Sequence, residues 1–284
     1  MSWHHARVTS TDTPATEAAE AAYELPAPWR PPLLWRALLA LARLAVPMFC
    51  RLRVTGDVPE ELRRGPLLLA GNHIGIFDPL ALVAACRTRR VAPRIMATAG
   101  VFRIPVAGRT LRSCGHIPVD RRNGNGGEAL GAALAAVRAG SVVAGYPEGR
   151  VTLDPGMWPE QGRTGLARVA LATGAVVVPV AQWGAHEVLA WDGAGTMARS
   201  AVSALWRRPV VRVHFGPPVD LTGLSAGTPG AAQSASDRIT EEVIAALEPL
   251  RAAEPGLPHY IDPVRPVTTA RSYPRRNRTY STTA

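Results

Sequence analysis

Short apolar runs that alternate with helical stretches constrain the fold of this chain more than any other feature of its sequence. The runs are too short for helices and have no polar side, as is typical of strands that are buried on both faces of a sheet. The alternation predicts one α/β domain with a mostly parallel mixed sheet flanked by helices. The expected strands are residues 66–70, 117–119, 141–146 and 175–180, and the expected helices are residues 79–86, 128–138, 164–173 and 237–250.

Two strand assignments also carry information about position. Val210–Phe215 alternates between apolar and polar residues, and we interpret it as a strand at a sheet edge. Pro179 lies near the end of the run 175–180. Because proline is rare in central strands, we expect this strand to end or bend at Pro179.

The two ends of the chain differ in composition from its middle. Residues 1–28 are rich in Thr, Ala, Glu and Pro and predict a flexible leader. They carry acidic residues and lack an early apolar core, which argues against a secretory signal. Residues 253–284 gather arginines among Ser, Thr and Pro and predict a basic, flexible tail. The folded domain is therefore expected over residues 56–252, after an N-terminal segment of residues 29–55.

That N-terminal segment contains the apolar stretch Leu33–Phe49. A helix that crosses a bilayer needs about 20 uncharged residues, and Arg36 and Arg43 interrupt this one. The two arginines are seven positions apart, so on a helix they share one face, opposite Leu34 and Leu38. Two interpretations remain open: an amphipathic helix in the membrane interface, which we favour, and a helix packed on the domain's own core.

The charge of the chain comes from arginine alone. There are 32 arginines, no lysine and 22 acidic residues, which gives a net charge of +10. The absence of lysine excludes a lysine Schiff base, a lysine general base and a P-loop lysine. Arginine favours partners with phosphate or carboxylate groups. The three cysteines have neither disulfide-framework nor zinc-site spacing, which indicates no metal site and a reducing, cytoplasmic compartment.

A candidate acid–base pair lies between the expected strand 66–70 and the helix that follows. Asp78 precedes Pro79, which predicts a helix N-cap with proline at the first helical position. His73 lies five residues earlier, in a loop that can fold back onto the carboxylate. The two residues could form the base half of a catalytic triad without a nucleophile. They could equally be a turn residue and a simple helix cap.

Two further stretches carry candidate anion-binding residues. A short strand leads to Arg121, and a second strand ends at Tyr146-Pro147-Glu148-Gly149-Arg150. Gly149 allows close approach of the backbone to a ligand, and Arg150 can hold a phosphate through several donors. Glu148 could orient that arginine or accept a hydrogen bond from a substrate hydroxyl.

In order along the chain, the patterns NHxxxxD, GxIxVDR, YPEG and VVVPV resemble the glycerolipid acyltransferase family, typified by 1-acylglycerol-3-phosphate acyltransferases. The resemblance covers roughly residues 33–215. It implies that His73 is the general base and that Asp78 orients it, so that the acceptor hydroxyl attacks a thioester directly. It further implies substrate-binding positions at Asn72, Arg121, Glu148, Gly149, Arg150 and Pro179.

The resemblance also implies the partners of this chain. The acceptor would be lysophosphatidic acid or a similar anionic lysophospholipid, in phospholipid biosynthesis. The co-substrate would be acyl-CoA or acyl carrier protein, with no cofactor and no metal. The protein would lie peripherally on the inner face of the cell membrane and bind no specific nucleic acid. No oligomeric state is predicted.

Three positions depart from the family pattern, and they keep alternatives open. Arg150 stands one position earlier than the family's arginine, Thr98 replaces a common lysine, and Arg163 replaces another. The acceptor could therefore be a different lipid, such as a glycolipid or an amino-acid-derived lipid. A third alternative is a non-enzymatic module that binds membranes or nucleic acids, which the pI of 10.8 suggests. However, no nucleic-acid motif or aromatic stacking platform accompanies the charge.

Overall fold

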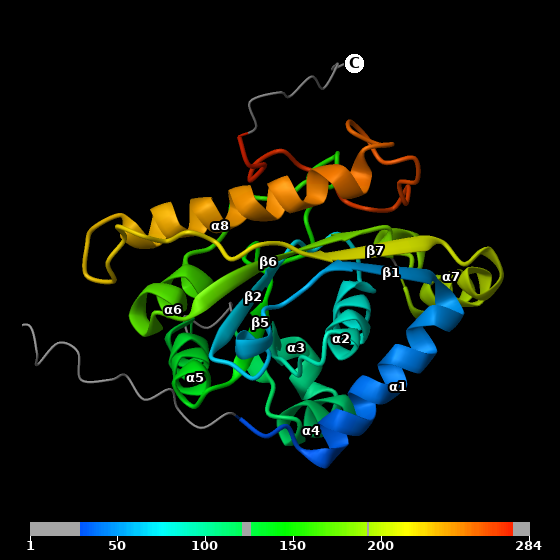
Figure 1. Cartoon of the computed structure of the whole chain (residues 1–284). Helices are drawn as coiled ribbons and strands as arrows, with labels where there is room; N and C mark the ends of the chain where they lie inside the picture. The colour runs from blue at the N-terminus through cyan, green and yellow to red at the C-terminus, as the bar shows by residue number, and fades with distance from the viewer. Residues whose placement is uncertain (1–28, 121–125, 192, 275–284) are drawn as a thin grey trace, which may run out of the picture.

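The computed structural model describes residues 29–120, 126–191 and 193–274, and these residues form a single seven-stranded sheet. The strand order is β1-β7-β6-β2-β5-β3-β4, and neighbours pair in parallel except for β6 and β7. The predicted mostly parallel mixed sheet is therefore confirmed (Figure 1). The strands are β1 (Arg51–Gly56), β2 (Leu67–Gly71), β3 (Arg94–Thr98), β4 (Ile117–Val119), β5 (Val142–Gly145), β6 (Val176–Trp183) and β7 (Val210–Phe215).

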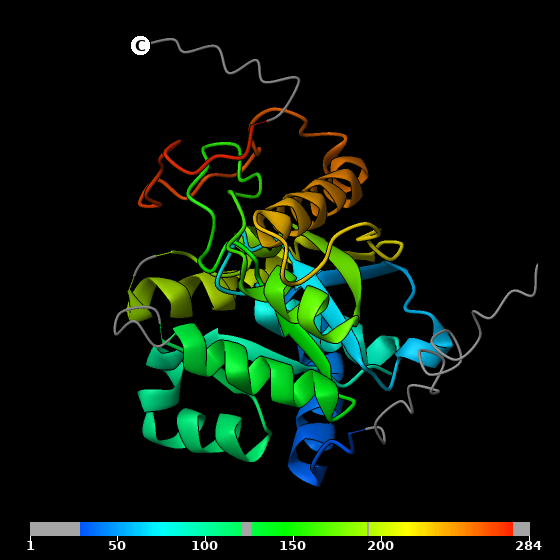
Figure 2. The ribbon, with the colours of Figure 1, turned by 90° about the vertical axis from the view of Figure 1, so that its left-hand side faces the viewer.

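Helices cover both faces of the sheet, as expected for strands that are apolar on both sides. One apolar cluster joins α1 and α2 to one face, and another joins α5, α6 and α8 to the other. Figure 2 shows α8 (orange) and α1 (blue) on opposite sides of the sheet. The α-helices are α1 (Leu33–Phe49), α2 (Asp78–Thr88), α3 (Ala99–Arg103), α4 (Pro105–Ser113), α5 (Gly126–Arg138), α6 (Gly165–Thr173), α7 (Ala194–Arg207) and α8 (Ala231–Leu247), and the 3₁₀ helices are η1 (Glu60–Leu62), η2 (Ala185–Glu187) and η3 (Glu248–Arg251).

The prediction that β7 is an edge strand is wrong, because β7 lies between β1 and β6. Its alternation has another cause. Val211, Val213 and Phe215 are buried in the cluster under α2, while His214 on the opposite face is only half-buried. Alternation therefore reports that one face of β7 is less covered, and it does not report the position of the strand in the sheet.

Pro179 does not end β6, which continues to Trp183. In the antiparallel register of β6 and β7, Pro179 lies opposite Gly216, directly beyond the last paired residue, Phe215. The Gly216 N–H donates to the Pro179 carbonyl over 2.9 Å. The missing N–H of proline thus falls where β7 has already ended, so the strand tolerates it.

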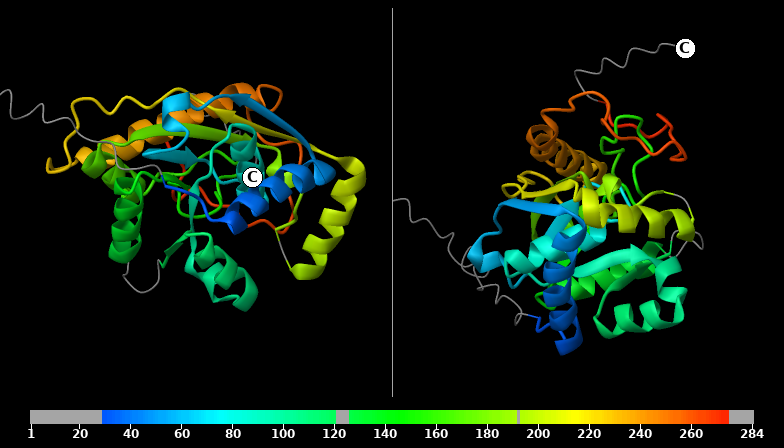
Figure 3. Two further views of the ribbon diagram at one scale, coloured as in Figure 1. Left: turned by 60° about the horizontal axis from the view of Figure 1, so that its bottom comes forward. Right: turned by 90° about the vertical axis from the view of Figure 1, so that its right-hand side faces the viewer.

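Helix α1 packs on the core of the domain. Trp35, Leu39 and Val46 are buried against it, and the Trp35 indole donates to the Pro93 carbonyl over 3.1 Å. The core-packed interpretation of Leu33–Phe49 is therefore confirmed. The helix nevertheless keeps five large apolar side chains exposed, and α1 and α4 lie on the side of the sheet away from α8 (Figure 3). These side chains are Leu33, Leu34, Leu41, Leu44 and Met48.

The C-terminal segment is not the flexible tail that the composition suggested, as far as it is described. Residues 262–273, here called the C-terminal strap, lie along the loop that follows β5 (Figure 2). The Thr268 N–H donates to the Leu153 carbonyl over 2.8 Å, and the Gln161 N–H donates to the Arg271 carbonyl over 2.7 Å. Main-chain hydrogen bonds of this kind hold a segment that has little apolar surface of its own. Residues 1–28 and 275–284 lie outside the described residues, so the predicted leader and the end of the tail remain predictions.

Candidate active site

The candidate site lies where β2 and β5 end. These strands are parallel neighbours with Ala70 opposite Gly145, so the loops that follow them leave the same edge of the sheet side by side. The first loop carries His73, and the second begins at Tyr146. This edge is where α/β sheets place ligand-binding groups, because helices and loops leave an opening there.

His73 and Asp78 meet in this opening. The His73 Nδ1 and the Asp78 Oδ2 are 2.8 Å apart. The same carboxylate oxygen accepts the backbone N–H groups of Ile74 (2.5 Å) and Gly75 (2.8 Å). The Asp78 side chain is fully buried, whereas 16% of the His73 side chain is exposed. The loop therefore folds back and brings the two side chains together, as their interpretation as the base half of a catalytic triad required.

The N-cap prediction for Asp78 is wrong by one position. Phe77 occupies the cap, and Asp78 is the first helical residue. Its carboxylate turns back toward the N–H groups of the preceding loop, and it does not cap the following turn. Three donors on one oxygen hold the carboxylate in place.

The pair has the geometry of a general base with its orienting partner. A carboxylate at Nδ1 accepts the ring N–H and selects the tautomer with a lone pair on Nε2. No described residue hydrogen-bonds the Nε2 atom. The partly exposed ring can therefore present Nε2 to a substrate.

Tyr146 holds the ring of His73 from one side, a role that the sequence analysis missed. The two rings stack with centroids 4.2 Å apart and planes inclined by 19°. The Gln182 side-chain amide donates to the Tyr146 hydroxyl oxygen over 3.4 Å. Burial raises the pKa of the Tyr146 hydroxyl, so it stays protonated. The signal in the sequence was its place at the end of a strand beside β2, within the YPEG block.

Glu148 supports the backbone of the histidine loop. Its carboxylate accepts the N–H of His73 over 2.8 Å and the N–H of Glu160 over 3.1 Å. Both oxygens are thus used by the main chain, and neither is directed at Arg150. Burial raises the pKa of Glu148 to about 8, against the opposing effect of the two backbone hydrogen bonds. Of the two roles that the sequence left open for Glu148, the orientation of Arg150 is wrong, and Glu148 instead holds the loop of His73 in place.

Arg150 is engaged by a carboxylate that sequence reasoning did not single out. Its Nε and Nη2 donate to the two oxygens of Glu160, each over 2.8 Å. Arg271 from the C-terminal strap also contacts Glu160, at 3.4 Å. About a third of the Arg150 side chain remains exposed. The Nε and Nη2 groups of this arginine are therefore already engaged in a bidentate pair.

Asn72 has a structural role in this arrangement. Its side chain donates to the Gln182 carbonyl over 2.9 Å and accepts the Gln182 N–H over 2.7 Å. The amide thus extends the pairing of β2 and β6 by one residue, and its buried atoms face no opening. Gly149 lies in the left-handed region at φ +71°, which explains a glycine there without a ligand. Pro179 is buried within β6, where it pairs with Ala70 of β2, three residues before His73.

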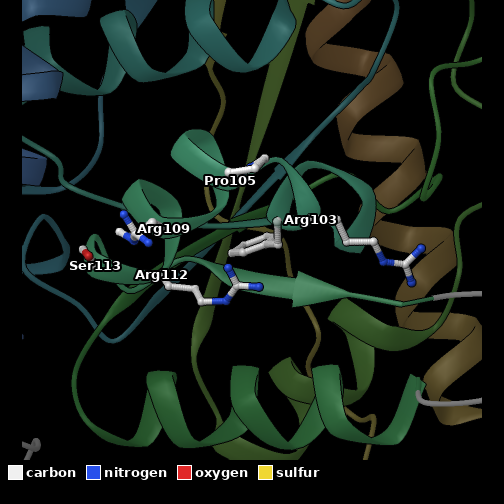
Figure 4. A pocket seen from close by; sticks show the side chains of 6 residues that line it. Arg103, Pro105, Arg109, Arg112 and Ser113 are labelled. Atoms are coloured by element: carbon white, nitrogen blue, oxygen red, sulfur yellow. The ribbon is translucent and has the colours of Figure 1, made fainter.

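Arg121 lies outside the described residues. The residue before it, Asp120, pairs with Arg103 over 3.3 Å. A hollow of about 550 Å³ lies beside this pair, over α3 and α4. In Figure 4 Arg103 extends away from Arg109 and Arg112, so the three cations do not converge on one point. The lining residues are Phe102, Arg103, Pro105, Arg109, Arg112 and Ser113.

The described residues contain no group of three His, Cys, Asp or Glu side chains placed to hold a metal ion. They also contain no helix with the length and hydrophobicity that crossing a bilayer requires. The three cysteines are buried and unpaired, and burial raises the pKa of each thiol. A thiolate nucleophile is therefore disfavoured at these positions.

Comparison with known proteins agrees with this fold. Residues 51–183 match the family model described as Acyltransferase. One matching solved structure is the 1-acyl-sn-glycerophosphate (LPA) acyltransferase PlsC from Thermotoga maritima, with a TM-score of 0.58 and 19% sequence identity. This match covers 77% of the present chain and 80% of the other and shows a shared fold. No curated protein sequence matches the chain.

Proposed function

We propose that the chain, whose residues 51–183 match the family model described as Acyltransferase, transfers a fatty acyl group from acyl-CoA or acyl carrier protein to the free hydroxyl of lysophosphatidic acid. The observation that carries this proposal is the hydrogen bond between His73 and Asp78 at the open edge of the sheet. A non-enzymatic basic module that binds membranes or nucleic acids through its charge does not require a histidine oriented by a carboxylate.

In the proposed reaction, His73 Nε2 removes the proton from the acceptor hydroxyl as the oxygen attacks the thioester carbonyl. The carbon–oxygen bond of the new ester forms, the carbon–sulfur bond breaks, and the imidazolium returns its proton to the leaving thiolate. Asp78 stabilises the imidazolium between these steps. Direct attack needs no acyl-enzyme, in agreement with the buried, protonated thiols of the cysteines.

The anionic head of the acceptor would be bound by Arg150, together with Arg121. Support for Arg150 is its place in the loop beside His73 and the exposed third of its side chain. Binding a phosphate would require Arg150 to share its donors between the ligand and Glu160, because that carboxylate holds two of them.

We further propose that the protein acts peripherally on the inner face of the cell membrane. The exposed apolar side chains of α1, among them Leu33 (78% exposed) and Leu44 (73% exposed), could enter the lipid interface. A net charge of +10 favours a surface rich in anionic lipid.

The reaction can be tested with purified protein, lysophosphatidic acid and acyl-CoA or acylated carrier protein, with the diacyl product measured by mass spectrometry. We expect ester formation with at least one donor, and no acyl adduct on the protein when the acceptor is left out. A stable acyl-protein that forms before the ester would contradict direct attack. No product with either donor would contradict lysophosphatidic acid as the acceptor.

One observation favours a second acceptor class. The engagement of Arg150 by Glu160 and the absence of a lysine at Thr98 leave fewer free cations beside the site than the family pattern has. A less anionic lipid, such as a glycolipid or an amino-acid-derived lipid, is therefore the alternative. A panel of such acceptors separates the two: turnover of these lipids without turnover of lysophosphatidic acid would select the alternative.

A further inference from the structure

Arg265 of the C-terminal strap is a buried cation behind the candidate site. Only 7% of the residue is exposed. Its Nη1 donates to the Ile74 carbonyl over 2.6 Å, and its Nη2 donates to the Thr152 carbonyl. Ile74 directly follows His73, and its N–H is one of the donors to the Asp78 carboxylate. Arg265 thus contacts the backbone unit between the two residues of the pair.

The two carbonyls belong to the two loops that meet at the site. The Thr152 N–H donates to the His73 carbonyl over 2.7 Å, and Glu148 accepts the His73 N–H. Arg265 adds a bridge between the same loops through one rigid, planar group. Without the guanidinium, two buried carbonyls would lose a donor, and the loop of His73 would be free to shift.

The positive charge of Arg265 also interacts electrostatically with Asp78 of the His73–Asp78 pair. Burial lowers the pKa of its guanidinium, and the coulombic interaction with Asp78 is the largest effect that opposes this. The guanidinium remains charged, because an arginine pKa starts far above neutral pH. Arg265 therefore places a buried positive charge that interacts with the Asp78 side chain, the partner of His73 Nδ1.

The strap is held in place by contacts that do not involve Arg265. Its Thr268 N–H and Arg271 carbonyl bond the loop after β5. The Ser272 hydroxyl donates to Asp154, and the Arg271 side chain donates to the Gln161 carbonyl over 2.7 Å. A substitution of Arg265 should therefore leave the strap seated and change mainly the two loops beneath it.

We propose that Arg265 is a positioning residue for the His73–Asp78 pair, supplied by a segment that lies outside the residues matched by the family model. The proposal rests on the proposed function for its kinetic meaning. It assigns the C-terminal strap to the active site, where the composition had suggested a solvated tail.

The test compares Arg265→Gln and Arg265→Lys with the wild-type full chain. Arg138→Gln, at an exposed arginine of α5, controls for charge, and Val267→Ala, at an exposed position of the strap, controls for location. We expect Arg265→Gln to lower kcat by about 10- to 100-fold, as misplacement of a catalytic group does, with KM for the acceptor changed less than twofold. The kcat of Arg265→Lys should lie between those of the wild type and Arg265→Gln, because an ammonium keeps the charge and does not bridge both carbonyls. Both controls should match the wild type.

A second readout does not depend on activity. In protein labelled with ¹⁵N-histidine, the ring-nitrogen shifts of His73, assigned with His73→Ala, report which nitrogen carries the proton. We expect one tautomer, protonated at Nδ1, in the wild type and a mixture in Arg265→Gln. This measurement separates the two proposals, because a wild type without activity on lysophosphatidic acid contradicts the proposed function and leaves the tautomer result to decide on Arg265.

Two results would overturn the role of Arg265. The first is an unchanged kcat together with an unchanged His73 tautomer in a folded Arg265→Gln protein. The second is a loss of activity that matches the loss of folded protein by circular dichroism. If Arg265→Gln does not fold, Arg265→Lys decides in its place: a folded lysine variant with wild-type kcat and tautomer contradicts the proposal, and one with lowered kcat, unchanged KM and mixed tautomers supports it.

Discussion

The Asp78 carboxylate accepts three hydrogen bonds through a single oxygen, Oδ2, and its other oxygen has no hydrogen-bond partner among the described residues. Two of the donors are backbone groups, and the third is the His73 ring. The backbone donors hold the carboxylate still, so that the ring receives a fixed acceptor. The orientation of the His73 ring therefore depends on this one oxygen.

Asp78→Asn tests that dependence. An amide can place its NH₂ group toward the ring and favour the tautomer in which Nε2 carries the proton and cannot act as a base. We expect kcat for acyl transfer to fall by about 10²–10⁴-fold, the range typical of lost general-base catalysis. Steady-state kinetics measures it, with the exposed carboxylate variant Asp220→Asn as the matched control. Equal kcat for Asp78→Asn and the wild type would remove the carboxylate from the mechanism.

Glu148 gives a prediction about stability and pH. The folded protein keeps a proton on Glu148 up to a pKa of about 8, whereas the unfolded chain loses it near the ordinary value of 4.5. Between these pH values the folded state binds more protons, so the free energy of unfolding should fall as the pH rises. Glu148→Gln cannot titrate and should flatten this part of the profile.

Urea unfolding of both proteins between pH 5 and pH 8 measures the difference. The absolute stability of Glu148→Gln is expected to be lower, because one of the amide's groups is a donor that faces the N–H of His73 or Glu160. The test therefore compares the slope of the free energy of unfolding against pH, and not the absolute stability. Parallel profiles for the two proteins would show that burial does not keep Glu148 protonated.

At the scale of elements, α1 has two different sides. Trp35 and Leu39 fasten it to the core, while Leu41 and Leu44 are 58% and 73% exposed. Because one side of α1 already packs on the core, its exposed side could enter a lipid interface without disturbing that packing. The two interpretations of the sequence are therefore compatible: the packing is observed, and the membrane contact is the proposal.

The double variant Leu41→Ser/Leu44→Ser tests the membrane contact. Removing two leucines from an interface should weaken binding to vesicles containing anionic lipid by about 10-fold or more, given about 1.5–3 kcal/mol for each fully buried leucine side chain. Sedimentation with vesicles measures the bound fraction. Leu257→Ser, an exposed leucine outside α1, is the control and should bind as the wild type does. Equal vesicle binding by all three proteins would contradict the proposed role of α1.

For the whole molecule, the succession of central strands and helices along the chain could be predicted from the sequence. β2, β5 and β6 are apolar on both faces, and the helices between them show a helical spacing of apolar residues. β1 and β3 were missed because Arg51, Arg53 and Arg94 interrupt their apolar pattern. These strands are partly exposed, so hydrophobicity alone does not mark them.

The contacts of the candidate site also fall into those that the sequence predicts and those that it does not. His73 and Asp78 are five residues apart, so their meeting follows from one loop and could be predicted. The contact from Arg265 to Ile74 spans 191 positions, and nothing in the neighbourhood of Arg265 indicates it. The pairing of Arg150 with Glu160 depends on how a long irregular loop folds, which periodicity does not describe.

The rate of the chemical step in a single turnover tests the central claim most directly. Enzyme in excess is mixed with acyl donor and lysophosphatidic acid, and ester formation is followed for the wild type, His73→Ala and the exposed-histidine control His259→Ala. We expect a rate constant about 10²–10⁴-fold lower for His73→Ala alone, with unchanged binding of the acceptor. A rate constant for His73→Ala equal to that of the wild type would contradict it.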